Sequence, residues 1–256
     1  MKVKIVAVIP AHLASVRFPN KILFEFHGIP MIEHVRRRAL LSNAISDVIV
    51  ATCDAEIADA VRGYGGNVIM TENTHKNGTT RVAEAVKDID CSHVVLLQGD
   101  EPLLLPRHID TFTQEILNNP DGDSWNATGP IKTAEEMDRH SFVKCSVSPD
   151  ENIMYCFRRS PCYSDFDTQK QFVRKILGII AYRKDFLLHI TSLPASPIEE
   201  AEFIEQMRIL ENGFSLKSVP VSPSLPSVNE PEEADIILKY IEDTSEQKIL
   251  LEKILK

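Results

Sequence analysis

The sequence predicts an α/β protein built on a parallel, doubly wound sheet. Short apolar runs rich in β-branched residues alternate with helical patterns four times within the first 120 residues. Four successive strand–helix units favour parallel strands covered by helices. The chain has 256 residues, of which 43% are hydrophobic and 25% charged. This composition is typical of a folded globular protein and argues against disorder.

The four strand–helix units can be placed along the chain from their patterns. The apolar positions Ile32, Val35 and Ala39 recur at helical spacing behind Pro30, and Asp54 is a candidate N-cap of the second helix. Arg36 to Arg38 are expected on the solvated face of the first helix. Strands are predicted at 3–9, 47–52, 67–70 and 93–98, and helices at 30–44, 54–66, 80–89 and about 107–118.

After Pro120 the strand–helix alternation stops. Two strands are predicted within 142–159 around a turn at 148–152, and further strands at 175–183 and 214–221. A single helix is expected over 196–213, because Ser196, Pro197 and Glu199 form an N-terminal capping signal and Gly213 a stop. One or two helices end the chain over 230–256.

Charge and cysteine content narrow the classes of partner and compartment. The formal net charge of −9 argues against nucleic acid or an anionic membrane as a partner through bulk electrostatics. The five cysteines are scattered without zinc spacing, which indicates reduced thiols in a cytoplasmic protein. The N-terminal apolar run has the length of one strand, so neither a signal peptide nor a membrane span is expected.

Three polar loops follow the predicted parallel strands, where open α/β sheets bind ligands. They read PAHLASVRFPNK, ENTHKNGTTR and QGDEP. The third loop interrupts the apolar run VVLLQGDEPLLLP, which is explained if Asp100 lies at the ligand rim. In the first loop, small residues would let backbone N–H groups approach an anion, and Arg17 and Lys21 supply charge for a triphosphate. A solvated loop with two surface cations accounts for these residues equally well.

Six segments together resemble one family. IPAHLASVRFPNK, HKNGTTRVAEA, LQGDEPLL, LGIIAYR, SPIEEAEFIEQMRILENG and VNEPEEAD occur in the order and at the spacing of the 3-deoxy-manno-octulosonate (KDO) cytidylyltransferases, also called CMP-KDO synthetases. The resemblance implies a Rossmann-like mixed sheet of the nucleotide-diphospho-sugar transferase type, with a β-rich insertion for acceptor binding and dimerisation. It also implies a single domain over 1–256, with a nucleotide-binding half (1–120), an acceptor-binding elaboration (121–228) and a C-terminal helical region (229–256).

The resemblance implies a set of residues for CTP. Lys21, Arg17 and Asp100 would be catalytic. His12 stands where the family has Arg, and Asn77 where it has Ser; a neutral imidazole is a poorer phosphate ligand than a guanidinium. The nucleotide-binding residues would be Pro10, Ala11, His12, Ser15, Asn77, Gly78, Arg81 and Gln98.

The resemblance also implies Mg²⁺ as cofactor. Asp100 matches the family's first metal ligand, and Asn229 stands where the family has a second Asp. An amide oxygen can bind Mg²⁺ without bringing negative charge, so this site would depend more on the triphosphate.

On the acceptor side, Gln98, Arg159, Glu205 and Gln206 keep the family's pattern and are expected to bind a sugar acid. Ile176 and Ile180 replace a family His and an aromatic residue, which makes the expected acceptor pocket more apolar. Arg208 is better explained as part of a structural ion pair than as a ligand.

The expected activity is transfer of CMP from CTP to a KDO-like sugar acid, with pyrophosphate as the second product and a homodimer as the implied assembly. Two alternatives stay open. The acceptor could be another acid, such as 8-amino-KDO, a nonulosonate or a phosphonate. The chain could also be an inactive CTP-binding relative, because of His12 and Asn229.

Overall fold

The computed structural model describes residues 3–15 and 17–256. Contacts between residues divide the chain into two compact units. The first unit combines residues up to Thr113 with the C-terminal segment from Leu225 to Lys256, and the second runs from Gln114 to Ser224.

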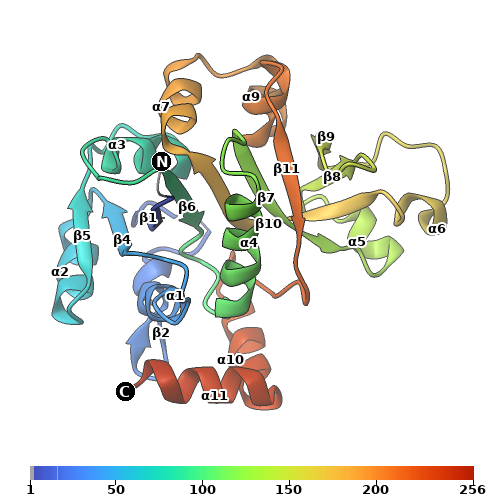
Figure 1. Ribbon diagram of the computed structural model, residues 1–256. Coiled ribbons are helices and arrows are strands. Elements are labelled where there is room, and N and C mark those ends of the chain that lie inside the picture. Colours follow the sequence, from blue (N-terminus) through green and yellow to red (C-terminus); the bar gives the residue numbers. More distant parts are fainter. Residues whose placement is uncertain (1–2, 16) are drawn as a thin grey trace. The chain divides into compact units, whose positions relative to one another are not determined.

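The first unit contains the predicted parallel sheet (Figure 1). Its strands lie in the order β6-β1-β4-β5, and each pairing is parallel. Ala7, for example, pairs with Val48 on one side and Val95 on the other. The doubly wound α/β prediction is therefore confirmed. The strands are β1 (Ile5–Ala11), β4 (Val48–Thr52), β5 (Asn67–Met70) and β6 (His93–Leu97).

Helices connect these strands, as the alternating pattern predicts. Ile32, Val35 and Ala39 are fully buried, so the predicted apolar face of the first helix is confirmed. The elements are η1 (Lys21–Leu23), the short hairpin β2 (Glu25–Phe26) and β3 (Ile29–Pro30), α1 (Met31–Ala39), α2 (Ala55–Gly63), α3 (Gly78–Ala85) and α4 (Pro106–Asn118), which runs on into the second unit.

The C-terminal segment belongs to the first unit. Its helices α10 (Glu233–Asp243) and α11 (Ser245–Ile254) are the red end of the chain in Figure 1. Val228, Ile237 and Ile241 form one buried cluster with Phe26 and Leu103. The segment that carries Asn229 is thereby anchored beside the loop that follows β6.

The arginines of α1 are not on a solvated face, so that expectation is wrong. Arg38 is fully buried, and its Nη1 atom donates to Gln247 Oε1 at 2.7 Å. Arg36 is 5% exposed and pairs with the buried Glu33 carboxylate. Helix α11 packs on α1, and a local pattern cannot reveal this cover. Burial lowers the pKa of Arg38 to about 10.

The second unit is built around a different set of strands. Strand β10 is antiparallel to β7 and β8, β8 is antiparallel to β9, and β11 is parallel to β7. These strands are β7 (Ser124–Pro130), β8 (Lys144–Val147), β9 (Ile153–Phe157), β10 (Val173–Arg183) and β11 (Leu216–Pro220).

Two features of this unit differ from the sequence prediction. Strand β7 was not predicted, although the polar residues Ser124, Asn126 and Thr128 alternate with Trp125 and Ala127, a pattern that favours a strand. The helix expected over 196–213 is broken into α8 (Pro197–Glu202) and α9 (Gln206–Glu211), because Phe203 adopts a left-handed conformation with φ of 54°. The remaining helices, also unexpected, are α5 (Ala134–Asp138), α6 (Phe166–Gln169) and α7 (Lys184–Ser192).

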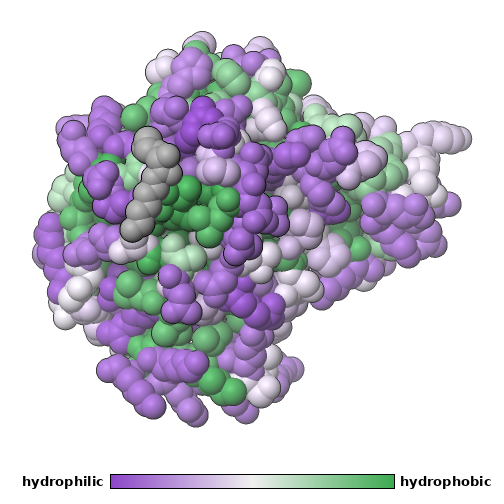
Figure 2. All heavy atoms as spheres, in the orientation of Figure 1, coloured by the Kyte–Doolittle hydropathy of each residue, from purple (hydrophilic) through white to green (hydrophobic). Residues whose placement is uncertain are grey.

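All five cysteines are free thiols. In the part of the chain that the structure describes, no helix has the length and apolar character needed to cross a membrane. On the face shown in Figure 2, hydrophilic residues cover most of the surface and hydrophobic residues form small patches between them.

Candidate active site

A cleft of about 580 Å³ opens in the first unit at the carboxyl ends of β1, β4, β5 and β6. It is lined by the loops that follow these strands, where parallel sheets place their ligands. The sequence-based prediction placed catalytic and nucleotide-binding residues on three of these loops. The structure brings all of them to the cleft wall: Pro10, Ala11, His12, Ser15, Arg17, Lys21, Asn77, Gly78, Arg81, Gln98 and Asp100.

The loop after β1 is held by a carboxylate from the loop after β4. Asp54 Oδ2 accepts a hydrogen bond from the backbone N–H of Leu13 at 2.8 Å. Asp54 does stand at the N-cap position of α2, but its side chain makes no capping hydrogen bond there. Asp54 lines the cleft, and its hydrogen bond to Leu13 holds the backbone next to His12 in place. Sequence reasoning missed this role, although the position directly after a parallel strand is a signal for it.

Lys21 and Asp100 form an ion pair in the cleft. Asn20 adopts the left-handed conformation (φ 55°) that Asn tolerates, and the turn η1 that follows carries Lys21. Lys21 Nζ donates to Asp100 Oδ2 at 2.7 Å and to the Val228 carbonyl oxygen at 2.8 Å. The backbone N–H of Val228 in turn donates to the Asp100 carbonyl oxygen at 2.9 Å. These contacts tie the loops after β1 and β6 to the C-terminal segment.

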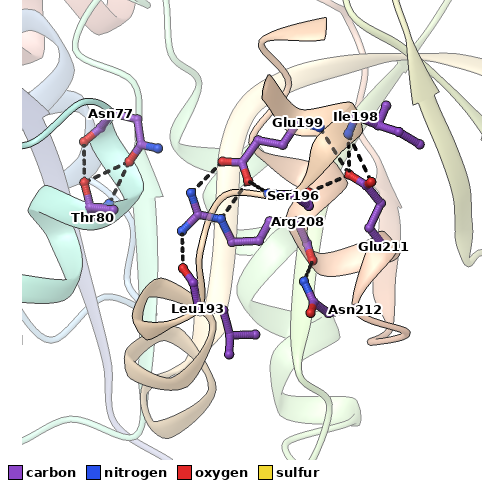
Figure 3. A network of polar contacts seen from close by, with 9 residues as sticks. All are labelled: Asn77, Thr80, Leu193, Ser196, Ile198, Glu199, Arg208, Glu211 and Asn212. Carbon is purple, nitrogen blue, oxygen red and sulfur yellow. Dashed lines mark hydrogen bonds and ion pairs between the residues drawn. The ribbon is translucent and has the colours of Figure 1, made fainter. Parts of the chain in front are cut away.

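Helix α3 braces the loop that precedes it through three side chains. Asn77, Arg81 and Glu84 are spaced by four and three residues, so they lie on one face of the helix. Asn77 Oδ1 caps the helix by accepting the Thr80 N–H at 3.0 Å (Figure 3). Arg81 Nη1 donates to Thr71 Oγ1 at 2.6 Å. The loop over 72–77 is thus shaped by the helix whose first turn faces the cleft.

Glu84 completes this brace, and sequence reasoning missed it. Its carboxylate accepts the Glu72 backbone N–H at 3.2 Å and also bonds His75 Nε2. This contact with His75 lowers the pKa of Glu84. His75 also lines the cleft. Its place in a loop after a parallel strand is the signal that could have identified it.

Close packing against Pro10 requires glycine at position 78, in addition to the role predicted for Gly78 in nucleotide binding. A Cβ atom at this position would lie 3.0 Å from Cγ of Pro10, which is tighter than ordinary van der Waals contact. The start of α3 therefore approaches the end of β1 closely only with glycine there. This approach brings the two predicted nucleotide-binding loops together.

The cleft carries positive charge that its own carboxylates do not balance. Arg81 is only 4% exposed, and its hydrogen-bond partners in the described chain are neutral oxygens, those of Thr71 and the Glu72 backbone. Partial burial, followed by the charge of Arg81, lowers the pKa of His12 below 6.5. Because a buried cation without a counter-ion is costly, this wall of the cleft suits an anionic ligand.

The predicted Mg²⁺ ligands can be tested for fit from their chemistry. Asp100 offers a carboxylate to the cleft, and Asn229 follows Val228, which is bonded to Asp100; Asn229 itself is not among the described cleft-lining residues. Both side chains offer the hard oxygen donors that Mg²⁺ prefers. Across residues 3–15 and 17–256, no three His, Cys, Asp or Glu side chains gather as metal ligands. Asp100 and Asn229 therefore fit a cation that takes most of its ligands from a bound triphosphate or from water.

The predicted acceptor residues other than Gln98 lie in the second unit. Arg159 is exposed and lines a pocket of about 490 Å³ together with Asp138 and Gln169. Gln206 is buried, and its Nε2 atom donates to Asn126 Oδ1 at 2.9 Å. Glu205 is the N-cap residue of α9. Arg159 and Gln206 therefore differ in accessibility.

Ile176 and Ile180 share one face of β10. They pair with Thr128 and Asn126 across the antiparallel ladder to β7, so their side chains lie on the same face as those two polar residues. Ile180 is 4% exposed. Ile180 consequently lies opposite Asn126, whose side chain is bonded to Gln206.

Arg208 takes part in a structural ion pair, as expected. It donates to both oxygens of Glu199, at 2.7 Å each (Figure 3). Glu199 also accepts the Ser196 N–H at 3.1 Å, which completes the predicted capping box. Glu211 accepts hydrogen bonds from Ser196 Oγ and the Ile198 N–H. This network closes the start of α8 onto α9.

Comparison with known proteins agrees with these observations. The family model described as Cytidylyltransferase matches residues 6–219. The 3-deoxy-manno-octulosonate cytidylyltransferase of Chlorobium limicola is 39% identical over 240 residues, which cover 92% of this chain and 96% of the relative. That of Geobacter metallireducens is 37% identical over 249 residues, covering 93% and 98%.

Solved structures give the same result. The structure of a CMP:2-keto-3-deoxy-manno-octonic acid synthetase complexed with CTP is similar with a TM-score of 0.88 and 34% identity, covering 94% of this chain and 99% of that one. A cytidylyltransferase from Leptospira borgpetersenii, 16% identical with a TM-score of 0.66 and coverage of 98% and 94%, shares the fold. The chain therefore belongs to the 3-deoxy-manno-octulosonate cytidylyltransferase family and is a cytidylyltransferase, one of the nucleotidyltransferases.

Proposed function

We propose that the protein transfers CMP from CTP to KDO or a closely related sugar acid and releases pyrophosphate, with Mg²⁺ as cofactor. The observation that carries the proposal is the convergence of the predicted nucleotide residues on one cleft, in a chain of this family. The product suits lipopolysaccharide biosynthesis in the cytoplasm.

The nucleotide end of the reaction is supported by the cleft's charge. Arg17 and Lys21 come from the loop after β1, and Arg81 comes from α3 on another wall. Guanidinium and ammonium groups bind phosphate oxygens through charge-assisted hydrogen bonds. The Asn77 side chain and backbone groups of the β5–α3 loop offer hydrogen bonds to a base. CTP in this cleft would thus meet cations at its phosphates and neutral polar groups at its cytosine.

The chemistry needs no protein nucleophile. A hydroxyl oxygen of the acceptor attacks the α-phosphorus in line, the bond from that phosphorus to the bridging oxygen breaks, and pyrophosphate leaves; the hydroxyl proton is released. Lys21 and Arg17 would neutralise charge on the phosphates, and positioning would supply most of the rate gain. Mg²⁺ held by Asp100 and Asn229 would supply further neutralisation of the phosphate oxygens.

A second acceptor class is favoured by one observation. Ile176 and Ile180 stand opposite Thr128 and Asn126 in the second unit and offer no hydrogen bonds, where the family pattern has a His and an aromatic residue. Another acid, such as 8-amino-KDO, a nonulosonate or a phosphonate, would be preferred to KDO where its own groups do not need hydrogen bonds at these two positions.

Pyrophosphate release tests the proposal. Purified protein is incubated with CTP, Mg²⁺ and each acceptor of a panel headed by KDO, with UTP and Asp100→Asn as controls. Turnover that requires CTP, Mg²⁺ and Asp100 supports the reaction, and the acceptor with the highest kcat/KM identifies the substrate. Absence of turnover with every acceptor, while calorimetry shows CTP binding, would contradict the proposal.

A homodimer is proposed as the assembly. Met154, Tyr163 and Phe203 are large apolar residues that the second unit exposes, and such residues are enriched in interfaces. Light scattering after size exclusion would test this, with Phe203→Asp expected to shift the species towards the monomer mass.

A further inference from the structure

The Lys21 ammonium is bonded to the carboxylate of Asp100, the residue expected to bind a metal ion. Lys21 Nζ lies 2.7 Å from Asp100 Oδ2 and 2.8 Å from the Val228 carbonyl oxygen. Mg²⁺ binds its oxygen ligands at about 2.1 Å and requires near-octahedral surroundings. An ammonium and a metal ion cannot both use the same lone pair of Oδ2. Oδ2 has a second lone pair, but two cations bound to one partly buried oxygen repel each other, so Lys21 and a metal ion compete for Asp100.

The pair is held in place from several directions. The Val228 N–H donates to the Asp100 carbonyl oxygen at 2.9 Å, so carboxylate and carbonyl present their oxygens to one point. The backbone N–H of Lys21 donates to the Phe18 carbonyl oxygen at 3.2 Å, which fixes the turn that carries the ammonium. The Lys21 side chain is 13% exposed and that of Asp100 26%. Water consequently screens this ion pair only in part.

The second carboxylate oxygen offers a free metal ion little alternative. A cation at Oδ1 would remain close to the Lys21 ammonium, and like charges in a partly buried site repel strongly. Across the described residues, no further cluster of three acidic, His or Cys side chains would compensate for that repulsion. Without nucleotide, a divalent cation would find only the Asp100 carboxylate, whose charge Lys21 already neutralises.

We propose that Lys21 keeps free divalent cations off Asp100, so that the enzyme takes its metal only together with the nucleotide triphosphate. The proposal rests on the proposed function, because it takes Asp100 as the metal ligand. The triphosphate offers Lys21 other anionic oxygens, draws the ammonium from Asp100 and brings phosphate ligands for the metal. Lys21 thereby makes the metal–nucleotide complex the substrate. The affinity for the metal ion rises when the nucleotide is bound, and the affinity for the nucleotide rises by the same factor when the metal ion is bound.

The test measures Mn²⁺ binding to the full-length protein without nucleotide. Free Mn²⁺ is followed by electron paramagnetic resonance for the wild type, Lys21→Met and the matched control Lys76→Met. Lys76 lines the same cleft and lies outside the Lys21–Asp100 pair, so its removal changes the charge without releasing the carboxylate. We expect Lys21→Met to bind Mn²⁺ roughly tenfold more tightly than the wild type, with little change for Lys76→Met.

A double variant shows where the gained metal binds. Adding Asp100→Asn to Lys21→Met should return Mn²⁺ affinity to the wild-type level. Equal gains from both lysine variants, no gain from Lys21→Met, or a gain that survives Asp100→Asn would each overturn the proposal. If Lys21→Met does not fold, as judged by circular dichroism, Lys21→Gln takes its place. Pyrophosphate release by the wild type is measured separately, so loss of this proposal leaves the proposed function standing.

Discussion

Two arginines, one in each unit, show how the protein uses the same side chain in opposite ways. Arg208 in the second unit is bound by both oxygens of Glu199 at 2.7 Å. Arg81 in the first unit is 4% exposed and hydrogen-bonds to neutral oxygens, with no carboxylate partner among the described residues. Arg208 has a counter-ion within the fold, whereas Arg81 lies at the cleft wall without a carboxylate partner among the described residues.

The difference follows from what each arginine must do. A paired charge in a protected place holds two helices together, because separating it would leave a carboxylate uncompensated. A charge without a counter-ion costs stability but stays available for an anionic ligand. Removing Arg208 should therefore lower stability and leave nucleotide binding unchanged. Removing Arg81 should weaken nucleotide binding with little effect on stability.

The largest effect is expected for Arg208→Met. Its side chain is 12% exposed, and its loss leaves the 8%-exposed Glu199 carboxylate without a counter-ion. We expect the free energy of unfolding to fall by about 3 kcal/mol, with unchanged CTP affinity of the folded protein. Urea denaturation and calorimetry measure the two quantities. Restored stability in Arg208→Met/Glu199→Met would identify the orphaned carboxylate as the cause, whereas equal losses in the single and double variants would refute it.

The converse effect is expected for Arg81→Met. The dissociation constant of CTP should rise by about 10- to 100-fold, because charge-assisted hydrogen bonds to phosphate are lost. The free energy of unfolding should change little, because the loss of a buried cation without a counter-ion offsets the loss of its hydrogen bonds to Thr71 and Glu72. A large loss of stability with unchanged CTP binding would show that Arg81 is structural, as Arg208 is.

Glu84→Gln tests whether the brace positions the nucleotide loop. Gln keeps a group that can accept the Glu72 N–H, but it loses the charge that binds His75. We expect the KM for CTP to rise about fivefold with little change in kcat, because the loop is loosened rather than removed. The exposed Glu56→Gln on α2 is the matched control. A fall in kcat at constant KM would place Glu84 in another role.

The smallest effect concerns pH. Partial burial and the charge of Arg81 lower the pKa of His12 below 6.5, so the ring is neutral at pH 7. A bound triphosphate favours the protonated ring and raises its pKa in the complex. Binding should therefore take up a proton in the window between these two pKa values, and CTP affinity should increase about threefold as pH falls through it.

Calorimetry in buffers of different ionisation enthalpy measures this proton uptake. The phosphate of CTP also titrates in this range, so His12→Asn provides the reference. If the wild type and His12→Asn take up the same number of protons, the imidazole plays no part in the linkage.

The sequence by itself determined the parallel sheet and the cleft at its edge. Strands β1, β4 and β6 are buried along their whole length, and such strands appear as continuous apolar runs. Connections between parallel strands bring their carboxyl ends to one edge, so the loops that carry Lys21, Asn77 and Asp100 could be assigned to one edge from order alone, and the family resemblance then assigned the residues. The capping box at Ser196 and the stop at Gly213 are equally local signals.

Only the tertiary structure decided what covers a surface and which side chains meet. Arg38 is buried because α11, more than 200 residues away, packs on its helix, and no local period contains that information. Asp54 and Glu84 reach loops instead of solvent for the same reason. Local sequence encodes backbone preference and one apolar face, whereas the partner of a polar side chain depends on contacts that form only when distant segments pack.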